Sequence, residues 1–216
     1  MVAMAESPRP TTHWTLDALG LDAAQPVRVL RGVRDGDRNT RHEHGFWEVS
    51  LIVGGEAVHE TDGGAGPMTA GHAIVIRPGV FHVFRECRSL EVMICAIVPS
   101  VLERELAWLY KDAVVGPLLR VNGDRVQAGE PVVVGLDEAA LARGRALLEP
   151  VATNRKRPPV HGRAEGIGRA AALLGEVGAA WSGQGGERPA MPRVVRKAAE
   201  ALEWAPARAW KMEDLS

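Results

Sequence analysis

The sequence has few of the features that would assign it to an exported or membrane-bound class. Its two cysteines, Cys87 and Cys95, are too few for a disulfide framework in 216 residues. They either face each other on neighbouring strands or are buried free thiols of a cytosolic protein, and the second interpretation is favoured. No apolar run approaches membrane length, and Glu6, Pro8 and Arg9 interrupt any signal-peptide pattern. We therefore expect a cytoplasmic protein with no membrane partner.

Neither sign of charge dominates the chain. It has 26 lysine and arginine residues against 27 aspartate and glutamate residues, which gives a formal net charge of -1. A surface that binds nucleic acid would therefore have to be local. The length suggests one or two domains, with enough apolar residues for one substantial core plus an appendage.

Short segments rich in β-branched residues fill the sequence from residue 26 to residue 98, with glycine-rich stretches between them. The segments expected to form strands are Val27–Val33, Phe46–Val53, Ala57–Thr61, Ala73–Arg77 and Leu90–Val98. Gly54-Gly55 and Gly63-Gly64 are expected to form turns, because glycine tolerates positive φ. Strands at this spacing predict a small barrel or jelly roll.

At residue 99 the sequence changes to helical patterns, so the predicted fold class is mainly β with α. Ser100 and Glu103 have the spacing of a capping box at the start of a helix. Val114–Arg120 predicts a short second helix. Asp137 is the expected N-cap of a helix that runs to about residue 150.

Three polar residues at even positions, His42, His44 and Glu48, form the most informative pattern in the chain. Alternate side chains of a strand point to opposite faces, so these three are expected on one side of a sheet. His82 follows the turn Arg77-Pro78-Gly79 as a fourth candidate. Three imidazoles and one carboxylate suit one divalent transition metal: Zn, Ni, Mn or Fe. The alternative is a polar cluster that hydrogen-bonds within the barrel or directly to an effector.

The same residues resemble the conserved motifs of the cupin superfamily. From Gly36 to Gly55 the order is glycine, five residues, His-x-His, three residues, Glu, six residues, glycine, which matches the first motif at every fixed position. Gly71–His82 resembles the second motif, with Arg77 in place of the usual proline and Glu86 in place of the usual closing asparagine. The resemblance implies a cupin (jelly-roll-like) β-barrel.

The order of the parts along the chain resembles that of AraC-type bacterial transcription regulators. The expected parts are a loose N-terminal lead-in (1–25), a cupin-like barrel (26–98), a helical segment that dimerises (99–181), a linker (182–192) and the start of a helix-turn-helix DNA-binding domain (193–216). The resemblance implies a sensing and dimerisation domain that binds a small-molecule effector, a carbohydrate in many members of the family.

A basic run near the C-terminus, Arg193, Arg196 and Lys197, is expected to be a remnant of the DNA-binding surface. Its alternative is an ordinary solvated helix face. A recognition helix reads bases in the major groove, and the sequence stops before one is reached. We therefore expect a truncated or degenerate regulator, with DNA a partner only of the full-length protein.

The inner side chains of the barrel are the expected effector pocket. By strand parity Phe46, Ser50 and Ile52 share the face of Glu48, whereas Trp47 falls on the other face and is expected to pack in the core. The remaining histidines are given no functional role. They are His13, His59, His72 and His161.

An apolar stripe of Leu174, Val177 and Trp181 on a helix after residue 160 is expected to form a homodimer contact, because a monomer would expose it. The alternative is simple packing of this helix on the barrel. For the whole chain, the competing function is a metal-dependent cupin enzyme of the dioxygenase or isomerase type. The expectation is a regulator without catalysis.

Overall fold

The structure is a computed structural model that describes residues 12–37, 40–120, 130–153 and 160–184. The chain divides into two compact units, residues 1–184 and 185–216. Most of the expected linker and all of the expected basic helix, with Arg193, Arg196 and Lys197, therefore lie outside the described residues. All elements below belong to the first unit.

Strands occupy most of the first half of the chain, and helices follow them. The strands are β1 (Thr12–Trp14), β2 (Val27–Gly36), β3 (His42–His44), β4 (Trp47–Thr61), β5 (Gly64–Thr69), β6 (His72–Ile76), β7 (Val83–Ile97) and β8 (Val132–Gly135). The α-helices are α1 (Pro99–Glu103), α2 (Val115–Arg120), α3 (Glu138–Leu148) and α4 (Arg163–Gly183). Short 3₁₀ turns are η1 (Asp17–Leu19), η2 (Ala107–Tyr110) and η3 (Glu149–Val151). The predicted class, mainly β with α, is confirmed.

The main sheet is antiparallel, in the order β2-β7-β4-β6-β8, and β5 pairs with the second half of β4. β1 and β3 form a separate parallel pair. The expected barrel is not closed by hydrogen bonds in the described part of the chain. At the outer edge of β2, Thr153 exchanges backbone hydrogen bonds with Val29 and Arg31.

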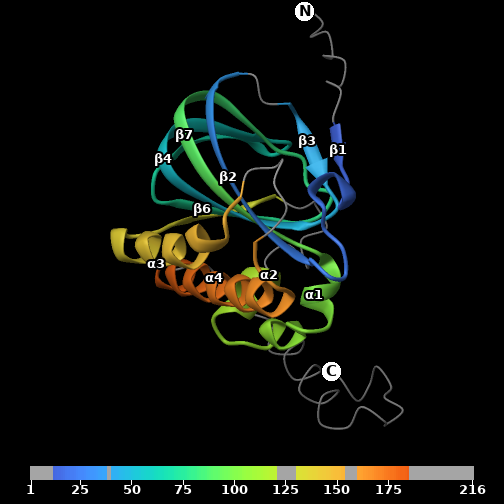
Figure 1. Cartoon of the computed structure of the whole chain (residues 1–216). Coiled ribbons are helices and arrows are strands. Elements are labelled where there is room, and N and C mark those ends of the chain that lie inside the picture. Colours follow the sequence, from blue (N-terminus) through green and yellow to red (C-terminus); the bar gives the residue numbers. More distant parts are fainter. Residues whose placement is uncertain (1–11, 38–39, 121–129, 154–159, 185–216) are drawn as a thin grey trace, which may run out of the picture. The chain divides into compact units, whose positions relative to one another are not determined.

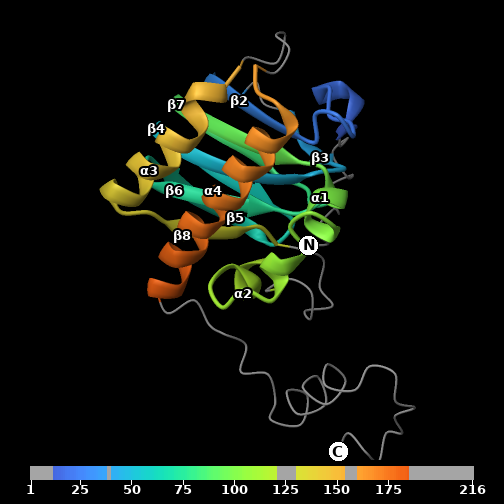
Figure 2. The same ribbon diagram turned by 60° about the horizontal axis from the view of Figure 1, so that its bottom comes forward.

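The two faces of the sheet carry different cores. On the helix face, Trp47, Val49 and Leu51 of β4 pack with residues of α2, α3 and α4. On the opposite face, here called the inner face, Phe46 and Ile52 pack with residues of β6 and β7. Figure 1 shows β2, β4 and β7 arching away from α3 and α4, and Figure 2 shows those two helices lying across the sheet. In the first half of β4, even-numbered residues therefore point to the inner face and odd-numbered residues point to the helix face, as the sequence predicted.

Gly54-Gly55 does not form the expected turn, because β4 continues through it as one strand of 15 residues. The pairing of β4 with β7 shifts register on both sides of Gly54 and again after Glu56. Gly55 has φ +70°, and a Cβ atom there would lie 2.1 Å from the carbonyl oxygen of Ser89. Only glycine fits this bulge, which bends the strand and reverses its parity. After the bulge, the odd-numbered Ala57 and His59 are the buried residues.

The helical predictions have mixed outcomes. Asp137 is the N-cap of α3, since its side chain accepts a hydrogen bond of 2.7 Å from the backbone N–H of Ala140. The capping box is wrong: α1 begins after Val98 with Pro99 in its first turn, and no side chain caps it. Proline supplies the helical φ and has no N–H to satisfy, so a hydroxyl cap is not needed there.

The stripe of Leu174, Val177 and Trp181 packs inside this chain. Leu174 and Val177 are 0% exposed and Trp181 is 9% exposed, all in the core between α4 and the sheet. The argument that a monomer would expose this stripe is therefore wrong, because the sheet itself covers it. None of the described helices is long and apolar enough to cross a membrane.

Both cysteines are buried thiols that form no disulfide, as the favoured interpretation predicted. They lie on the same strand, β7, and on opposite faces, with Cys95 in the helix-face core and Cys87 in the inner core. The alternative pairing across neighbouring strands is therefore wrong. Burial raises the pKa of the Cys95 thiol to about 12, so this thiol is unreactive.

Candidate functional site

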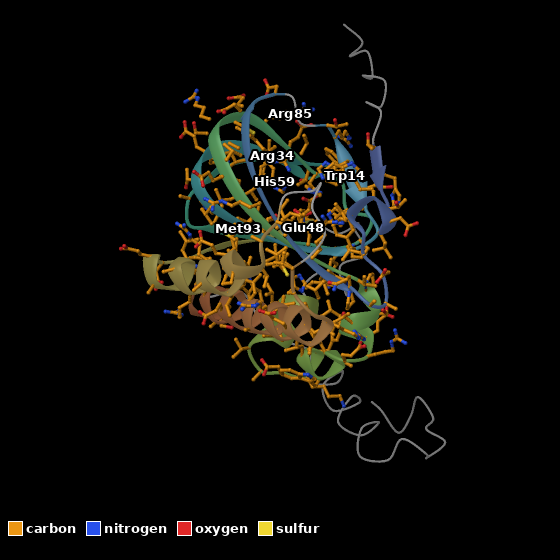
Figure 3. All side chains as sticks on the ribbon, in the orientation of Figure 1. Trp14, Arg34, Glu48, His59, Arg85 and Met93 are labelled. Atoms are coloured by element: carbon orange, nitrogen blue, oxygen red, sulfur yellow. The ribbon has the colours of Figure 1, made fainter. Side chains whose placement is uncertain are left out.

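A buried polar cluster lies on the inner face of the sheet. Glu48 comes from β4, His44 ends β3 and His82 precedes β7, and all three side chains are buried. One ligand atom from each lies within 4.8 Å of the others. In Figure 3 Glu48 and His59 lie within the arch of β4 and β7, away from α3 and α4. Three of the four residues expected to ligate a metal are therefore brought together.

His44 is oriented so that its Nε2 atom faces the carboxylate. Its Nδ1 atom lies 2.8 Å from the backbone carbonyl of Phe46, which can only accept a hydrogen bond, so Nδ1 carries the proton. Nε2 lies 3.3 Å from Oε2 of Glu48 but makes no hydrogen bond of good geometry with any residue that the structure describes. In neutral His44 two lone pairs would face each other here. A proton on Nε2 or a cation bound between the two groups would relieve this repulsion.

His82 and His42 share this orientation. Nδ1 of His82 lies 3.3 Å from the carbonyl of Val80, and Nδ1 of His42 lies 2.8 Å from the carbonyl of Thr40. Each carbonyl holds the proton on Nδ1 and leaves the Nε2 lone pair available. Histidines that ligate metals are characteristically oriented by such a hydrogen bond from the second ring nitrogen.

The charges of the cluster follow from burial and from close neighbours. Burial alone would raise the pKa of Glu48, but the His44 and His82 imidazoles and the Ser50 hydroxyl lower it far below its usual value. Burial lowers the pKa of His82 to about 3. It also lowers the pKa of His42. The site thus presents an ionised carboxylate beside the neutral imidazoles of His42 and His82, the protonation states in which these groups bind a cation.

His42, the fourth expected ligand, lies at the edge of the cluster. Its ring stacks on Trp14, with centroids 4.2 Å apart, and approaches His82 with centroids 4.3 Å apart. It is not among the three residues whose ligand atoms converge. Trp14 belongs to β1, which pairs directly with the His42–His44 strand, so the N-terminal segment positions this imidazole.

The three residues expected to line an effector pocket contact the cluster or belong to the core around it. Ser50 donates a hydrogen bond of 2.7 Å to Oε1 of Glu48. The Phe46 ring stacks on His44, with centroids 4.1 Å apart and planes 6° apart. Ile52 belongs to the surrounding inner core. These contacts fix the carboxylate and one imidazole in place.

His59 is a functional candidate that the sequence reasoning missed. It is 3% exposed, its ring lies 5.8 Å from that of His82, and its Nε2 atom has no hydrogen-bond partner in the described structure. Burial lowers its pKa to about 4. The signal for it was the Gly54-Gly55 pair, since a bulge at this point turns odd-numbered residues toward the cluster.

The other histidines without an assigned role lie apart from the cluster. His13 is exposed beside Glu43, and His72 hydrogen-bonds within the turn at Thr69. His161 is buried against Gly166, ahead of α4.

The residues present fit a divalent transition metal. His44, Glu48 and His82 supply two imidazole nitrogens and a carboxylate within reach of one ion, and His42 adjoins them. The buried Nε2 atom of His44, which has no well-directed hydrogen bond, is the observation that such an ion would explain. A site with three such ligands leaves open positions at which an effector could bind.

Comparisons with known proteins give a family. Residues 26–128 match the family model described as the AraC-like ligand binding domain. The chain is similar in structure to apo ToxT K231A from Vibrio cholerae, with 10% sequence identity and a TM-score of 0.49 over 88% of this chain and 69% of that chain. The AraC-like transcriptional activator CuxR is similar with 11% sequence identity and a TM-score of 0.47, over 88% of this chain and 65% of that chain. A cupin-2 domain protein from Shewanella frigidimarina has 20% identity and a TM-score of 0.31, over 35% of this chain and 74% of its own. No curated protein sequence matches the chain.

Proposed function

Residues 26–128 belong to the family of AraC-like ligand-binding domains, and from this premise we propose that the chain is the sensing part of an AraC-type bacterial transcription regulator. The observation that carries the proposal is the buried cluster of His44, Glu48 and His82 on an inner face whose other buried residues are mostly apolar. Burying ionisable groups without full hydrogen bonding costs several kcal/mol. A ligand bound there would offset that cost.

The proposal includes one divalent transition metal, Zn, Ni, Mn or Fe, at this cluster. His44, Glu48 and His82 would hold it, with His42 beside them. When bound, the metal would supply a positive charge next to Glu48 and open positions for donor atoms of an effector. Ser50 holds the carboxylate by its hydrogen bond, and Phe46 fixes the His44 ring by stacking.

The partners in the proposal are a small-molecule effector and a second copy of the chain. Because the apolar stripe of α4 is covered by its own sheet, the proposed two-fold contact uses the segment between β7 and α2, which exposes apolar side chains. Trp108 is 57% exposed and Val114 is 37% exposed in that segment. Tryptophan is enriched at protein interfaces. The two buried thiols, which form no disulfide, support a cytoplasmic location.

DNA binding by Arg193, Arg196 and Lys197 stays a prediction from the sequence. A carbohydrate effector also stays a prediction from the sequence, because a metal held by the cluster could bind hydroxyl, carboxylate or amine groups of an effector. The competing function is a metal-dependent cupin enzyme, which the same imidazoles and carboxylate would serve.

Native mass spectrometry of the protein purified from its own host tests the proposal. A sensor should carry a metal ion or a small molecule that is lost in the His44→Ala variant, and the molecule should be recovered unchanged after long incubation. The matched control is His13→Ala, because His13 is exposed and lies outside the cluster. A wild-type mass equal to that of the bare chain would contradict a ligand site. Conversion of the recovered molecule would favour the enzyme instead.

A further inference from the structure

The two imidazoles that converge in the cluster belong to different elements of the fold. His44 ends β3, a strand of three residues outside the main sheet, whereas His82 precedes β7. A backbone bridge joins these elements: the N–H of His82 donates a hydrogen bond of 3.0 Å to the carbonyl of His42, and the N–H of His42 donates one of 3.3 Å in return. The N–H of Gly79 donates a further one, of 2.9 Å, to the carbonyl of His44. The relative position of the two imidazoles depends on this junction, here called the β3 junction.

Arg41 lies at the end of the β3 junction, directly before β3. Its guanidinium carbon lies 3.1 Å from the centre of the Phe81 ring, and Phe81 directly precedes His82. The ring is buried, and the Arg41 side chain is 22% exposed. A guanidinium over an aromatic face is attracted to it, more strongly where water is largely excluded. This contact connects the residue before His42 with the residue before His82.

Two carboxylates near the tip of the β4–β5 hairpin hold the guanidinium over that ring. Nη2 of Arg41 lies 2.6 Å from Oδ1 of Asp62, and Nη1 lies 3.9 Å from Oε1 of Glu60. Oε2 of Glu60 lies 3.3 Å from Nε of Arg85, which follows His82 by three residues on β7. The ion pairs therefore connect β3, the hairpin and β7 on both sides of His82.

The contacts of Arg41 matter for metal binding because an ion needs both imidazoles at once. Zinc binds histidine nitrogen at about 2.0–2.1 Å, so one ion cannot reach His44 and His82 if β3 moves away. A strand of three residues held by few hydrogen bonds opens at a lower free energy than the main sheet. The apparent affinity for the metal falls by the fraction of molecules in which the junction is open.

We propose that Arg41 is a positioning residue of the metal site, which keeps the β3 junction closed so that His44 and His82 face one ion. It acts through the Phe81 ring and the hairpin carboxylates and is not itself a ligand. The inference rests on the metal site proposed above.

Calorimetric titration of the full chain with zinc tests the inference through Arg41→Met, which keeps an unbranched apolar side chain and removes the guanidinium. Zinc should bind about tenfold more weakly than in the wild type, the lower end of the loss caused by removing groups that orient metal ligands. The matched control is Arg169→Met, which should leave zinc affinity unchanged. Arg169 is 24% exposed and pairs with Glu165, but it lies on α4, across the sheet from the cluster.

Two further measurements distinguish a positioning residue from a ligand or a general contribution to stability. At saturation with cobalt, Arg41→Met should have the visible absorption spectrum of the wild type, because its ligands are unchanged, whereas His82→Ala should not. Asp62→Asn should weaken zinc binding about twofold to fivefold in the wild type and not at all in Arg41→Met, because both changes remove the same ion pair. Arg41→Lys should restore part of the affinity, since it keeps the charge but not the planar group.

Four results would overturn the inference. Unchanged zinc affinity in Arg41→Met, or in Asp62→Asn where Arg41→Met does not fold, would show that the contact does not position the ligands. An equal loss in Arg169→Met would show an effect of stability alone. A changed cobalt spectrum in Arg41→Met would show a changed ligand set. A wild-type chain that binds no zinc would remove the metal site as well, so the failure of this inference and the failure of the proposed site are distinguishable.

Discussion

Replacement of Gly55 by alanine should destabilise the protein more than replacement of any freely accessible glycine. Two effects add at this position. The backbone has φ +70°, which costs a residue with a Cβ atom about 1–2 kcal/mol. The new Cβ atom would also lie 2.1 Å from the backbone oxygen of Ser89 and 2.5 Å from that of Arg88, a clash that only movement of β7 can relieve. Overpacking of this kind costs about 1–3 kcal/mol.

Two further glycines separate these effects. Gly36 has φ +65°, but a Cβ atom added there would have no neighbour within 4 Å among the described residues, so Gly36→Ala should show the conformational cost alone. Gly32 has neither a positive φ nor a close neighbour, so Gly32→Ala should change the free energy of unfolding by less than about 0.5 kcal/mol. Urea denaturation followed by tryptophan fluorescence measures all three variants on one scale.

The expected order of destabilisation is Gly55→Ala, then Gly36→Ala, then Gly32→Ala, with roughly 2–5 kcal/mol for the first when the two contributions are added. If Gly55→Ala costs no more than Gly36→Ala, the close approach of β7 does not require glycine, and the reasoning that places His59 by the bulge fails.

Three other predictions concern the core and the cluster. The metal-free protein should lose stability as the pH falls from 6.5 toward 3, by about 1.4 kcal/mol per pH unit for each buried histidine that is titrating. The reason is that burial lowers the pKa values of His59 and His82 in the folded chain, so the unfolded chain binds protons first. Unfolding curves in buffers across this range measure the effect, and a flat profile would contradict it. Leu174→Ala should lower the free energy of unfolding by about 2–5 kcal/mol, because Leu174 packs within the core of its own chain. Light scattering should find the same oligomeric state for the variant and the wild type. Dissociation of an oligomer would show instead that the residue lies at an interface. Glu48→Gln should weaken metal retention less than His44→Ala does, because an amide oxygen can still ligate the metal whereas alanine removes the ligand atom. Elemental analysis of the purified variants measures the retained metal. The reverse order would mean that the carboxylate is the principal ligand.

The cluster could be predicted from the sequence because it depends on local spacing. His44 ends β3 and Glu48 lies at the start of β4, and the turn before His82 brings that residue to the same face. The alternation of residues therefore predicted the cluster correctly, although a bend separates the two strands. Ser50 and Ile52 follow from the same parity. The sequence predicted that His42 lies near the cluster, but not that it lies at the edge, outside the three converging residues. Its orientation depends on stacking with Trp14, a residue far away in the sequence.

His59 and the burial of α4 could not be predicted in this way, because both depend on long-range contacts. A Gly-Gly pair permits either a turn or a bulge, and the choice at Gly54-Gly55 is made by β7, which runs beside it with its own positive-φ residues Glu86 and Ser89. Likewise, the apolar stripe of α4 fits a dimer contact or a sheet equally well. The sheet covers it here, and the sequence of the helix alone contains no sign of that.

Calorimetric titration of the metal-free protein with zinc tests the central claim most directly, namely that the buried cluster is a ligand site for a cation. The wild-type chain and the His13→Ala control should bind about one zinc ion per chain, whereas His44→Ala and His82→Ala should bind it at least tenfold more weakly. Binding should also weaken as the pH falls, since protons compete for the imidazoles. Zinc binding that is absent from the wild-type chain, or equally strong in all four proteins, would contradict the account.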